Sequence, residues 1–161
     1  MSIETVRNYF KQFGIENNII EFDVSSATVE LAAKAIGCTE GEIAKTLAFK
    51  NKKSGEGFII VVTSGDVKID NTKFKQTFSM KATLIPPPEV AEITSHEVGG
   101  VCPFAIPDGI PVYLDESLKK YETIYPACGS HNSAIKLTWR EIEKYASGDH
   151  QWVHVTKERD A

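Results

Sequence analysis

The chain has 161 residues, of which 42% are hydrophobic, and a formal net charge of −4. This length and apolar content support one well-buried core, so we expect a single domain over residues 1–161. No segment approaches the roughly 18 consecutive apolar residues of a membrane helix, and the first residues lack the apolar core of a signal peptide. The three cysteines have no C-x-x-C spacing, which indicates reduced thiols. The sequence therefore predicts a cytoplasmic protein without a membrane partner.

Hydrophobic periodicity predicts helices and strands that together define a mixed α+β chain. Apolar residues spaced by three or four positions indicate helices, and alternating or short continuous apolar runs indicate strands. The predicted helices cover residues 3–13, 28–36, a short stretch after Thr39, a stretch after Asp70 that carries Phe74 and Phe78, residues 89–93, residues 116–121, and a last helix after Thr138. The predicted strands cover residues 20–24, 47–49, 58–62, 82–84, 112–114, 124–125 and 134–137.

The charge is unevenly distributed along the chain. Residues 45–81 contain eight basic and three acidic side chains, whereas residues 1–44 and 82–161 carry net charges of −4 and −5. A basic segment on an acidic protein is typical of a face that contacts phosphate groups. An ordinary lysine-rich hairpin and a solvated helix face explain the same charges, so both interpretations stay open.

Three short segments have residue types that suit chemistry. The first is Ala44-Lys45-Thr46-Leu47, where a lysine at a helix-to-strand junction can place an ammonium on a phosphate or a carbonyl oxygen. The second is the loop Gly99–Phe104, whose two glycines and Pro103 favour a backbone that presents its own N–H and C=O groups to a ligand. The third is the polar loop 128–133, which lies between apolar strands and contains Gly129. Alone, each also fits a surface lysine or a tight turn.

Taken in order, these segments resemble one family. The chain reads A-K-T-L-x-F at 44–49, G-D-V-K-I-D at 65–70, G-G-V-C-P-F at 99–104 and P-V-Y-L-D-E-S-L at 111–118. This ordered set resembles the YbaK/EbsC family, the free-standing relatives of the editing domain in bacterial prolyl-tRNA synthetase. The resemblance implies an α+β fold with a mixed, partly barrel-like β-sheet flanked by helices. It also implies hydrolysis of mischarged aminoacyl-tRNA, typically alanyl- or cysteinyl-tRNA for proline.

The resemblance also implies the roles of individual residues. Lys45 matches the essential catalytic lysine of the family, and Thr46 lies beside it in the same pocket. The substrate-binding residues implied by the two glycine loops are Gly99, Gly100, Val101, Cys102, Pro103, Gly129 and Ser130. Thr94-Ser95-His96 stands where members often have Thr-Gly-aromatic, and Cys102 lies inside the loop, so the amino acid removed stays open.

The chemistry expected from this resemblance needs no cofactor and no metal. Backbone N–H donors and one ammonium can stabilise the oxyanion of an activated ester, while the substrate itself helps to activate the attacking group. The expected partner is a mischarged aminoacyl-tRNA, with prolyl-tRNA synthetase as a candidate protein partner, and no DNA. The alternative is a regulatory module of the same fold that binds tRNA ends or a protein without hydrolysis.

Two other functional hypotheses involve the cysteines. Cys102 with His96 or His131 would form the thiol–imidazole pair of a thiol hydrolase. Cys128 and His131 have the spacing of half a zinc site, without a second matching pair. A cysteine among apolar residues is more often a small buried hydrophobe, which disfavours both readings.

Overall fold

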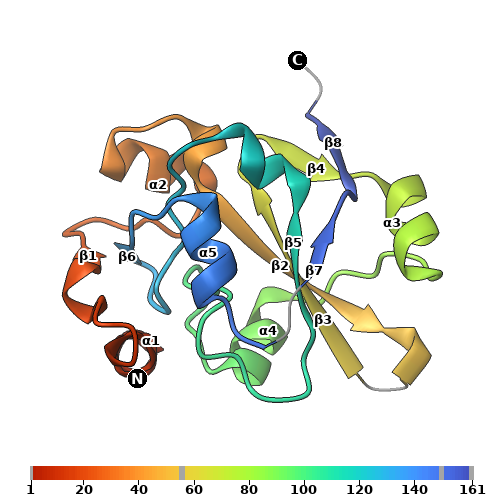
Figure 1. Ribbon diagram of the computed structural model, residues 1–161, viewed down its shortest axis with the longest axis horizontal. Coiled ribbons are helices and arrows are strands. Elements are labelled where there is room, and N and C mark those ends of the chain that lie inside the picture. Colours follow the sequence, from red (N-terminus) through yellow and green to blue (C-terminus); the bar gives the residue numbers. More distant parts are fainter. Residues whose placement is uncertain (1, 55–56, 149–150, 160–161) are drawn as a thin grey trace.

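The computed structural model describes residues 2–54, 57–148 and 151–159. Its centre is a four-stranded sheet in the order β2-β3-β5-β7 (Figure 1). β2 (Ala44–Asn51) pairs antiparallel with β3 (Gly57–Ser64) along its whole length. β5 (Val112–Asp115) and β7 (Gln151–Val153) follow in parallel. β2 is therefore an edge strand of this sheet.

Hydrophobic cores cover both faces of the sheet, and β3 contributes to each. Ile60 and Val62 pack into the larger core, whereas the alternate residues Ile59 and Val61 pack into the smaller one. Successive side chains of a strand point to opposite faces, so the continuous apolar run of β3 is what a strand buried on both faces requires. The expectation of a buried strand over 58–62 is confirmed.

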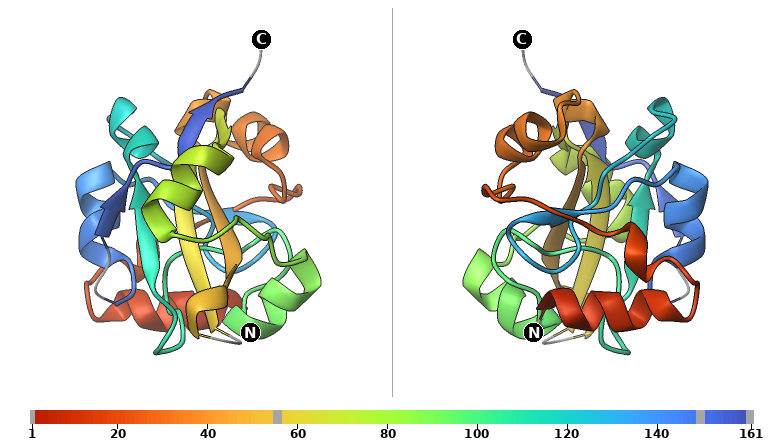
Figure 2. Two further views of the ribbon diagram at one scale, coloured as in Figure 1. Left: turned by 90° about the vertical axis from the view of Figure 1, so that its right-hand side faces the viewer. Right: turned by 90° about the vertical axis from the view of Figure 1, so that its left-hand side faces the viewer.

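Helices flank both faces of the sheet (Figures 1 and 2). Side chains of α1, α4 and α5 enter the larger core, α3 enters the smaller core, and α2 packs on a third cluster beside the start of β2. The helix bounds are α1 (Ser2–Lys11), α2 (Val29–Ile36), α3 (Asn71–Phe78), α4 (Pro87–Thr94) and α5 (Trp139–Tyr145). The 3₁₀ turns are η1 (Glu16–Asn18), η2 (Glu40–Glu42), η3 (Lys52–Ser54) and η4 (Glu116–Lys120). Two small antiparallel pairs complete the fold: β1 (Ile20–Glu21) with β6 (Ser133–Ala134), and β4 (Val67–Ile69) with β8 (Thr156–Glu158).

Capping side chains set the helix starts that the sequence indicates. The Thr28 hydroxyl accepts a hydrogen bond from the Leu31 N–H at the start of α2, and Gly37 ends this helix in the left-handed region with φ 85°. Asp70 caps α3, and Thr138 forms a capping box at α5. The α+β class with a mixed, helix-flanked sheet is confirmed, and the described strands form separate sheets rather than a closed barrel.

Several predicted elements differ in the structure. Residues 82–84 and 124–125 form only isolated bridges, and residues 134–137 pair as a strand only at Ala134. The alternation over 20–24 does not mark a half-buried strand, because Ile20 and Val24 are 39% and 60% exposed. The helix predicted over residues 116–121 is present over 116–120 and is of the 3₁₀ type. Strands β7 and β8 lie near the end of the described chain, where no strand was expected. Each has three residues, and hydrogen bonds to β5 and β4 hold them in the extended conformation.

No helix in the part of the chain that the structure describes is both long and apolar enough to cross a membrane.

Candidate active site

A cavity of about 450 Å³ opens beside β2. α2 lies near one end of this strand and α4 near the other, both on its outer side (Figure 2). The remaining wall comes from the loop around Gly99 and from the segment 125–134. The cavity thus lies along the outer edge of the sheet, between elements that are far apart in the sequence.

β2 contributes five consecutive residues, Ala44 to Ala48, to the cavity wall. Side chains of successive strand residues point to opposite faces of a sheet. A run of five neighbours can line one cavity only if the edge of the strand faces it. Lys45 and Thr46 are therefore both at the cavity, although their side chains leave the strand on opposite sides.

The Lys45 ammonium is partly buried and donates a hydrogen bond to the Val67 carbonyl oxygen at 2.8 Å. Burial lowers the pKa of Lys45, and the nearby Arg159 adds to this effect while Asp66 opposes it. An ammonium has three N–H donors, so two remain without a partner within the described residues. The lysine is held in place and keeps donors for a ligand.

The opposite wall contains Gly99 and Val101. Gly99 has φ +86°, and a Cβ at this position would lie 2.6 Å from the Ala27 Cβ atom. Only glycine allows both this backbone conformation and this contact. The glycine therefore brings the loop against the start of α2, where Ala27, Thr28 and Val29 also line the cavity.

The other glycines of the two loops contact each other rather than the cavity. A Cβ on Gly100 would lie 2.5 Å from the Ser130 backbone nitrogen, and the Gly129 N–H donates to the Gly100 carbonyl oxygen at 2.9 Å. Gly129 has φ +96°. Three of the residues expected to bind substrate line the cavity: Thr46, Gly99 and Val101. The other expected residues do not line it: Gly100, Cys102, Pro103, Gly129 and Ser130.

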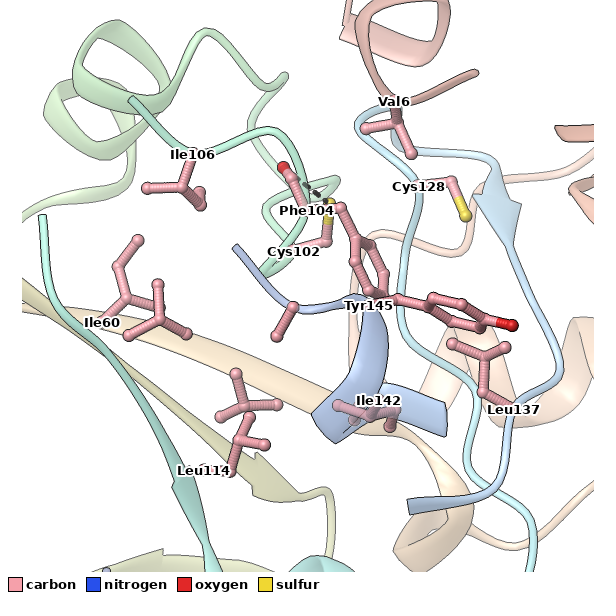
Figure 3. Close-up of a cluster of buried hydrophobic side chains, with 14 of the residues drawn as sticks. Val6, Ile60, Cys102, Phe104, Ile106, Leu114, Cys128, Leu137, Ile142 and Tyr145 are labelled. Carbon is pink, nitrogen blue, oxygen red and sulfur yellow. Dashed lines mark hydrogen bonds between the residues drawn. The ribbon is translucent and has the colours of Figure 1, made fainter. Parts of the chain in front are cut away.

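Cys102 lies in the larger core, among the side chains shown in Figure 3. Its Sγ atom is 3.6 Å from His96 Nε2, but the thiol is fully buried and His96 is 2% exposed. Burial raises the pKa of Cys102 to about 12 and lowers the pKa of His96. A nucleophile needs the thiolate and access to its substrate. The pair therefore has the residue types of a thiol hydrolase without the environment of one.

The hypothesis of a zinc site at Cys128 and His131 is not supported by the geometry of the described residues. Cys128 is fully buried, while the exposed His131 hydrogen-bonds to the Glu97 carboxylate at 2.9 Å. Within residues 2–54, 57–148 and 151–159, no three His, Cys, Asp or Glu side chains form a cluster that could hold a metal ion.

The structure adds wall residues that the sequence patterns did not single out. Tyr125 stands beside Ile43 and the first residue of β2, and burial raises the pKa of its phenol. Leu84, Ile85 and the proline-led start of α4 close the other end of the cavity. The three prolines at 86–88 signal a chain reversal, but nothing in the sequence indicates that this turn lies against β2.

The cavity wall contains few titratable side chains and is mostly apolar. Among the described residues that line the cavity, the titratable groups are Lys45 and Tyr125, and there is no carboxylate. The remaining lining is mostly alanine, valine, leucine, isoleucine and proline. Such a site can bind a small organic group and stabilise negative charge through an ammonium and backbone N–H groups. It offers no side-chain pair for general acid–base catalysis.

The class of this protein follows from its sequence match: the aminoacyl-tRNA editing domain family matches residues 24–145, and the chain is a member of that family. It is also 49% identical over 158 residues to the uncharacterized protein YwhH of Bacillus subtilis, a match that covers 98% of this chain and 99% of YwhH. Membership supports a role in tRNA editing.

Solved structures agree with this assignment. One is described as that of a candidate trans-editing enzyme for prolyl tRNA synthetase; it is 26% identical, has a TM-score of 0.83, and the match covers 97% of each chain. A second is the hypothetical protein APE2540, at 26% identity and a TM-score of 0.76, with 92% of this chain and 99% of that one covered. The YbaK-like resemblance is thus confirmed.

Proposed function

We propose that this protein is a trans-editing aminoacyl-tRNA deacylase that removes alanine or cysteine from mischarged proline tRNA. The observation that supports this most directly is the edge cavity, which joins the Lys45–Thr46 segment of β2 to the Gly99–Val101 loop. Its volume of about 450 Å³ suits a small ligand. The described residues that line it include no carboxylate, which suits a substrate whose ester is already activated.

The reaction needs positioning and charge stabilisation more than acid–base chemistry. Water attacks the ester carbonyl carbon, the bond from that carbon to the ribose oxygen breaks, and the ribose oxygen takes up a proton. The products are the free amino acid and the uncharged tRNA. Lys45 stabilises the developing negative charge with its two remaining N–H donors, since a fixed cation in a partly buried site acts more strongly than one in water. A neighbouring hydroxyl of the substrate ribose assists the water.

Each wall has a part in this proposal. Thr46 holds the aminoacyl group from the β2 side, and the backbone of Gly99 and Val101 holds it from the other side. Gly100, Gly129 and Ser130 act through packing, because they fix the loop that carries Gly99. Cys102 supports the same loop from the core, and the buried Pro103 restricts its backbone.

The test is a deacylation assay with proline tRNA charged separately with alanine, cysteine, serine or proline. We expect the alanyl or cysteinyl ester to be hydrolysed faster than the prolyl ester, beyond the uncatalysed rate. A protein that binds the charged tRNA without hydrolysing any ester would instead be a regulatory module of the same fold. Adding prolyl-tRNA synthetase to both assays tests whether it is a partner. Action on charged tRNA would place the protein in the cytoplasm.

A further inference from the structure

The outer edge of β2 is covered at both ends and open in the middle. At its start, the Ala44 N–H donates to the Tyr125 carbonyl oxygen at 3.1 Å. At its end, the Ala48 carbonyl oxygen accepts from the Ile85 N–H at 3.0 Å, and the Lys50 N–H donates to the Thr83 carbonyl oxygen at 2.9 Å. All three residues with outward-facing backbone groups have even numbers.

This parity fixes the direction of the Thr46 backbone. In an antiparallel pair, alternate residues of a strand direct both their N–H and C=O groups to the same side. The register from Ala44–Ser64 to Asn51–Gly57 runs without a bulge, so Thr46 faces outward like Ala44 and Ala48. Within the described residues, neither its N–H nor its C=O has a hydrogen-bond partner.

The open groups face the cavity, not bulk solvent, because Ala44 to Ala48 line it. The Thr46 Oγ1 atom is also buried and has no hydrogen-bond partner in the described residues. Buried polar groups are nearly always paired in folded proteins. The buried Thr46 hydroxyl without a partner, and beside it a backbone donor and acceptor that open on the cavity, therefore indicate a polar ligand at this point of the edge.

We infer that the aminoacyl group binds to Thr46 as a one-residue β-strand, an inference that rests on the proposed deacylase function. An aminoacyl ester has an amino group and a carbonyl group on either side of one carbon, as a residue in a strand does. In a closely spaced antiparallel pair, two opposed residues exchange both hydrogen bonds. The substrate ammonium donates to the Thr46 carbonyl oxygen, and the Thr46 N–H donates to the ester carbonyl oxygen.

This pairing gives both open backbone groups of Thr46 a chemical role. The described residues of the cavity wall include no carboxylate to bind the substrate ammonium, so a backbone carbonyl takes that place. The Thr46 N–H stabilises the negative charge that develops on the ester carbonyl oxygen during water attack. Pairing of a ligand with the free edge of a sheet is a general mode of recognition.

The pairing also sets the direction of the substrate side chain. Directly opposed residues of an antiparallel pair have their side chains on the same face of the sheet. Ala44 and Ala48 lie on the Thr46 face with Ile85 and Val90, all in the larger core. Leu47 lies on the opposite face, against the smaller core. An L-aminoacyl side chain enters the first of these two regions, and a D-aminoacyl side chain would enter the second.

The substrate arm of the test uses the unaltered protein. Proline tRNA is acylated with L-alanine, D-alanine or L-lactic acid, which replaces the amino group by a hydroxyl. If the cysteinyl ester is the better substrate, cysteine and 3-mercaptolactic acid take these places. We expect the hydroxy-acid ester to lose about 10- to 100-fold in kcat/KM, the range for a charge-assisted hydrogen bond, and the D ester to lose at least as much. Equal rates for amino and hydroxy esters would overturn the inference and leave the deacylase function intact.

The protein arm uses two proline variants. Among the backbone groups, Thr46→Pro removes only an outward-facing N–H, which an edge strand tolerates, and it also removes the buried hydroxyl. We expect the fold to persist and kcat to fall at least tenfold. Leu47→Pro removes an N–H that bonds to β3, and we expect it to unfold the protein. If Thr46→Pro unfolds as well, the substrate arm decides. A folded Thr46→Pro variant with unchanged kcat overturns the pairing. If the unaltered protein hydrolyses no ester at all, the proposed function itself fails.

Discussion

The Lys45–Thr46 segment and the His96–Cys102 pair show how environment decides what a residue type can do. By residue type alone, the thiol and imidazole are the more reactive pair. In the structure Cys102 is buried in the larger core and His96 is buried beside it, and burial raises the pKa of Cys102 to about 12. Lys45 and Thr46 are less reactive residues, but they stand where the sheet edge opens to a cavity.

The two pairs also differ in how their polar groups are used. The His96 Nε2 atom hydrogen-bonds to the Phe104 carbonyl oxygen at 2.8 Å, and this contact fixes the loop after Pro103. The Lys45 ammonium and the Thr46 backbone keep donors and an acceptor that no described residue uses. His96 Nδ1 also lacks a partner among the described residues, but it is buried away from the cavity. Unpaired polar groups that line a cavity, rather than intrinsic reactivity, therefore distinguish the candidate active site from the core.

The most direct test of the difference between these two pairs is to remove the Lys45 ammonium. Replacing Lys45 by alanine should lower kcat/KM for deacylation by about 100-fold or more, the range for losing one group that stabilises an oxyanion. The melting temperature should change by only a few degrees, because burial of this charge is already unfavourable. Single-turnover deacylation and thermal unfolding measure the two effects.

The matched control for Lys45 is Lys34→Ala, which removes an exposed lysine of α2. It should leave both quantities within about twofold and one degree, as is usual for surface substitutions. Deacylation by the Lys45→Ala variant at the wild-type rate would remove the lysine from the site.

A second prediction concerns the contact between the two glycine loops. In the Gly100→Val variant a Cβ would meet the Ser130 backbone at 2.5 Å, and backbone cannot yield as a flexible side chain does. We expect a loss of about 2–3 kcal/mol in the free energy of unfolding, with lower activity because Gly99 moves with the loop. Denaturant unfolding and deacylation of the same preparation measure both.

Gly109→Val is the comparison variant for Gly100→Val. A Cβ on Gly109 meets nothing within 4 Å, but its φ of +91° is strained for valine. It should cost about 1–2 kcal/mol from backbone strain alone and leave kcat unchanged. A larger cost at Gly109 than at Gly100 would mean that the loops separate easily.

Much of this arrangement follows from local sequence signals. The capping residues Thr28, Asp70 and Thr138 and the apolar run of β3 place most helices and the central strand. These features depend on hydrogen bonds and periodicity within about ten residues of the chain, so they can be read without the tertiary structure. The family resemblance adds the position of Lys45 beside the glycine loop.

The remaining features depend on contacts between distant segments. Nothing in the sequence shows that Tyr125 and residues 83–85 cover the two ends of β2 and leave Thr46 open. Gly99 and Gly100 are neighbours in one loop, yet one faces the cavity and the other faces Ser130. β7 and β8 pair with β5 and β4 although each has only three residues, too few for a clear strand pattern. Tertiary pairing, rather than propensity, decides each of these.

A third prediction tests the basic segment, where the lysines differ in freedom. Lys75 and Lys81 are exposed, whereas the Lys73 ammonium donates to the Thr156 carbonyl oxygen at 2.8 Å. Reversal of both exposed charges, Lys75→Glu with Lys81→Glu, should raise KM about tenfold at low salt with a smaller change in kcat. The salt dependence of KM should weaken by about two phosphate contacts. KM values that respond neither to salt nor to the reversal would leave these lysines as a solvated surface.

The smallest expected effect on activity is at Cys102, and it separates backbone chemistry from thiol chemistry. Cys102→Ala removes a buried sulfur without touching a backbone donor, so kcat/KM should stay within about twofold of wild type. The small void should cost about 1 kcal/mol, or roughly 2–4 °C in melting temperature. Loss of a true nucleophile would instead lower kcat by several orders of magnitude.

The same argument applies to alkylation: with a pKa of about 12, the Cys102 thiol is ionised to roughly one part in ten thousand at pH 8. Iodoacetamide should therefore modify the partly exposed Cys38 in the folded protein and reach Cys102 only after unfolding, as mass spectrometry of peptides would show. Rapid modification of Cys102 in the folded state, or an acyl group trapped on its sulfur, would move the chemistry from the strand edge to the thiol.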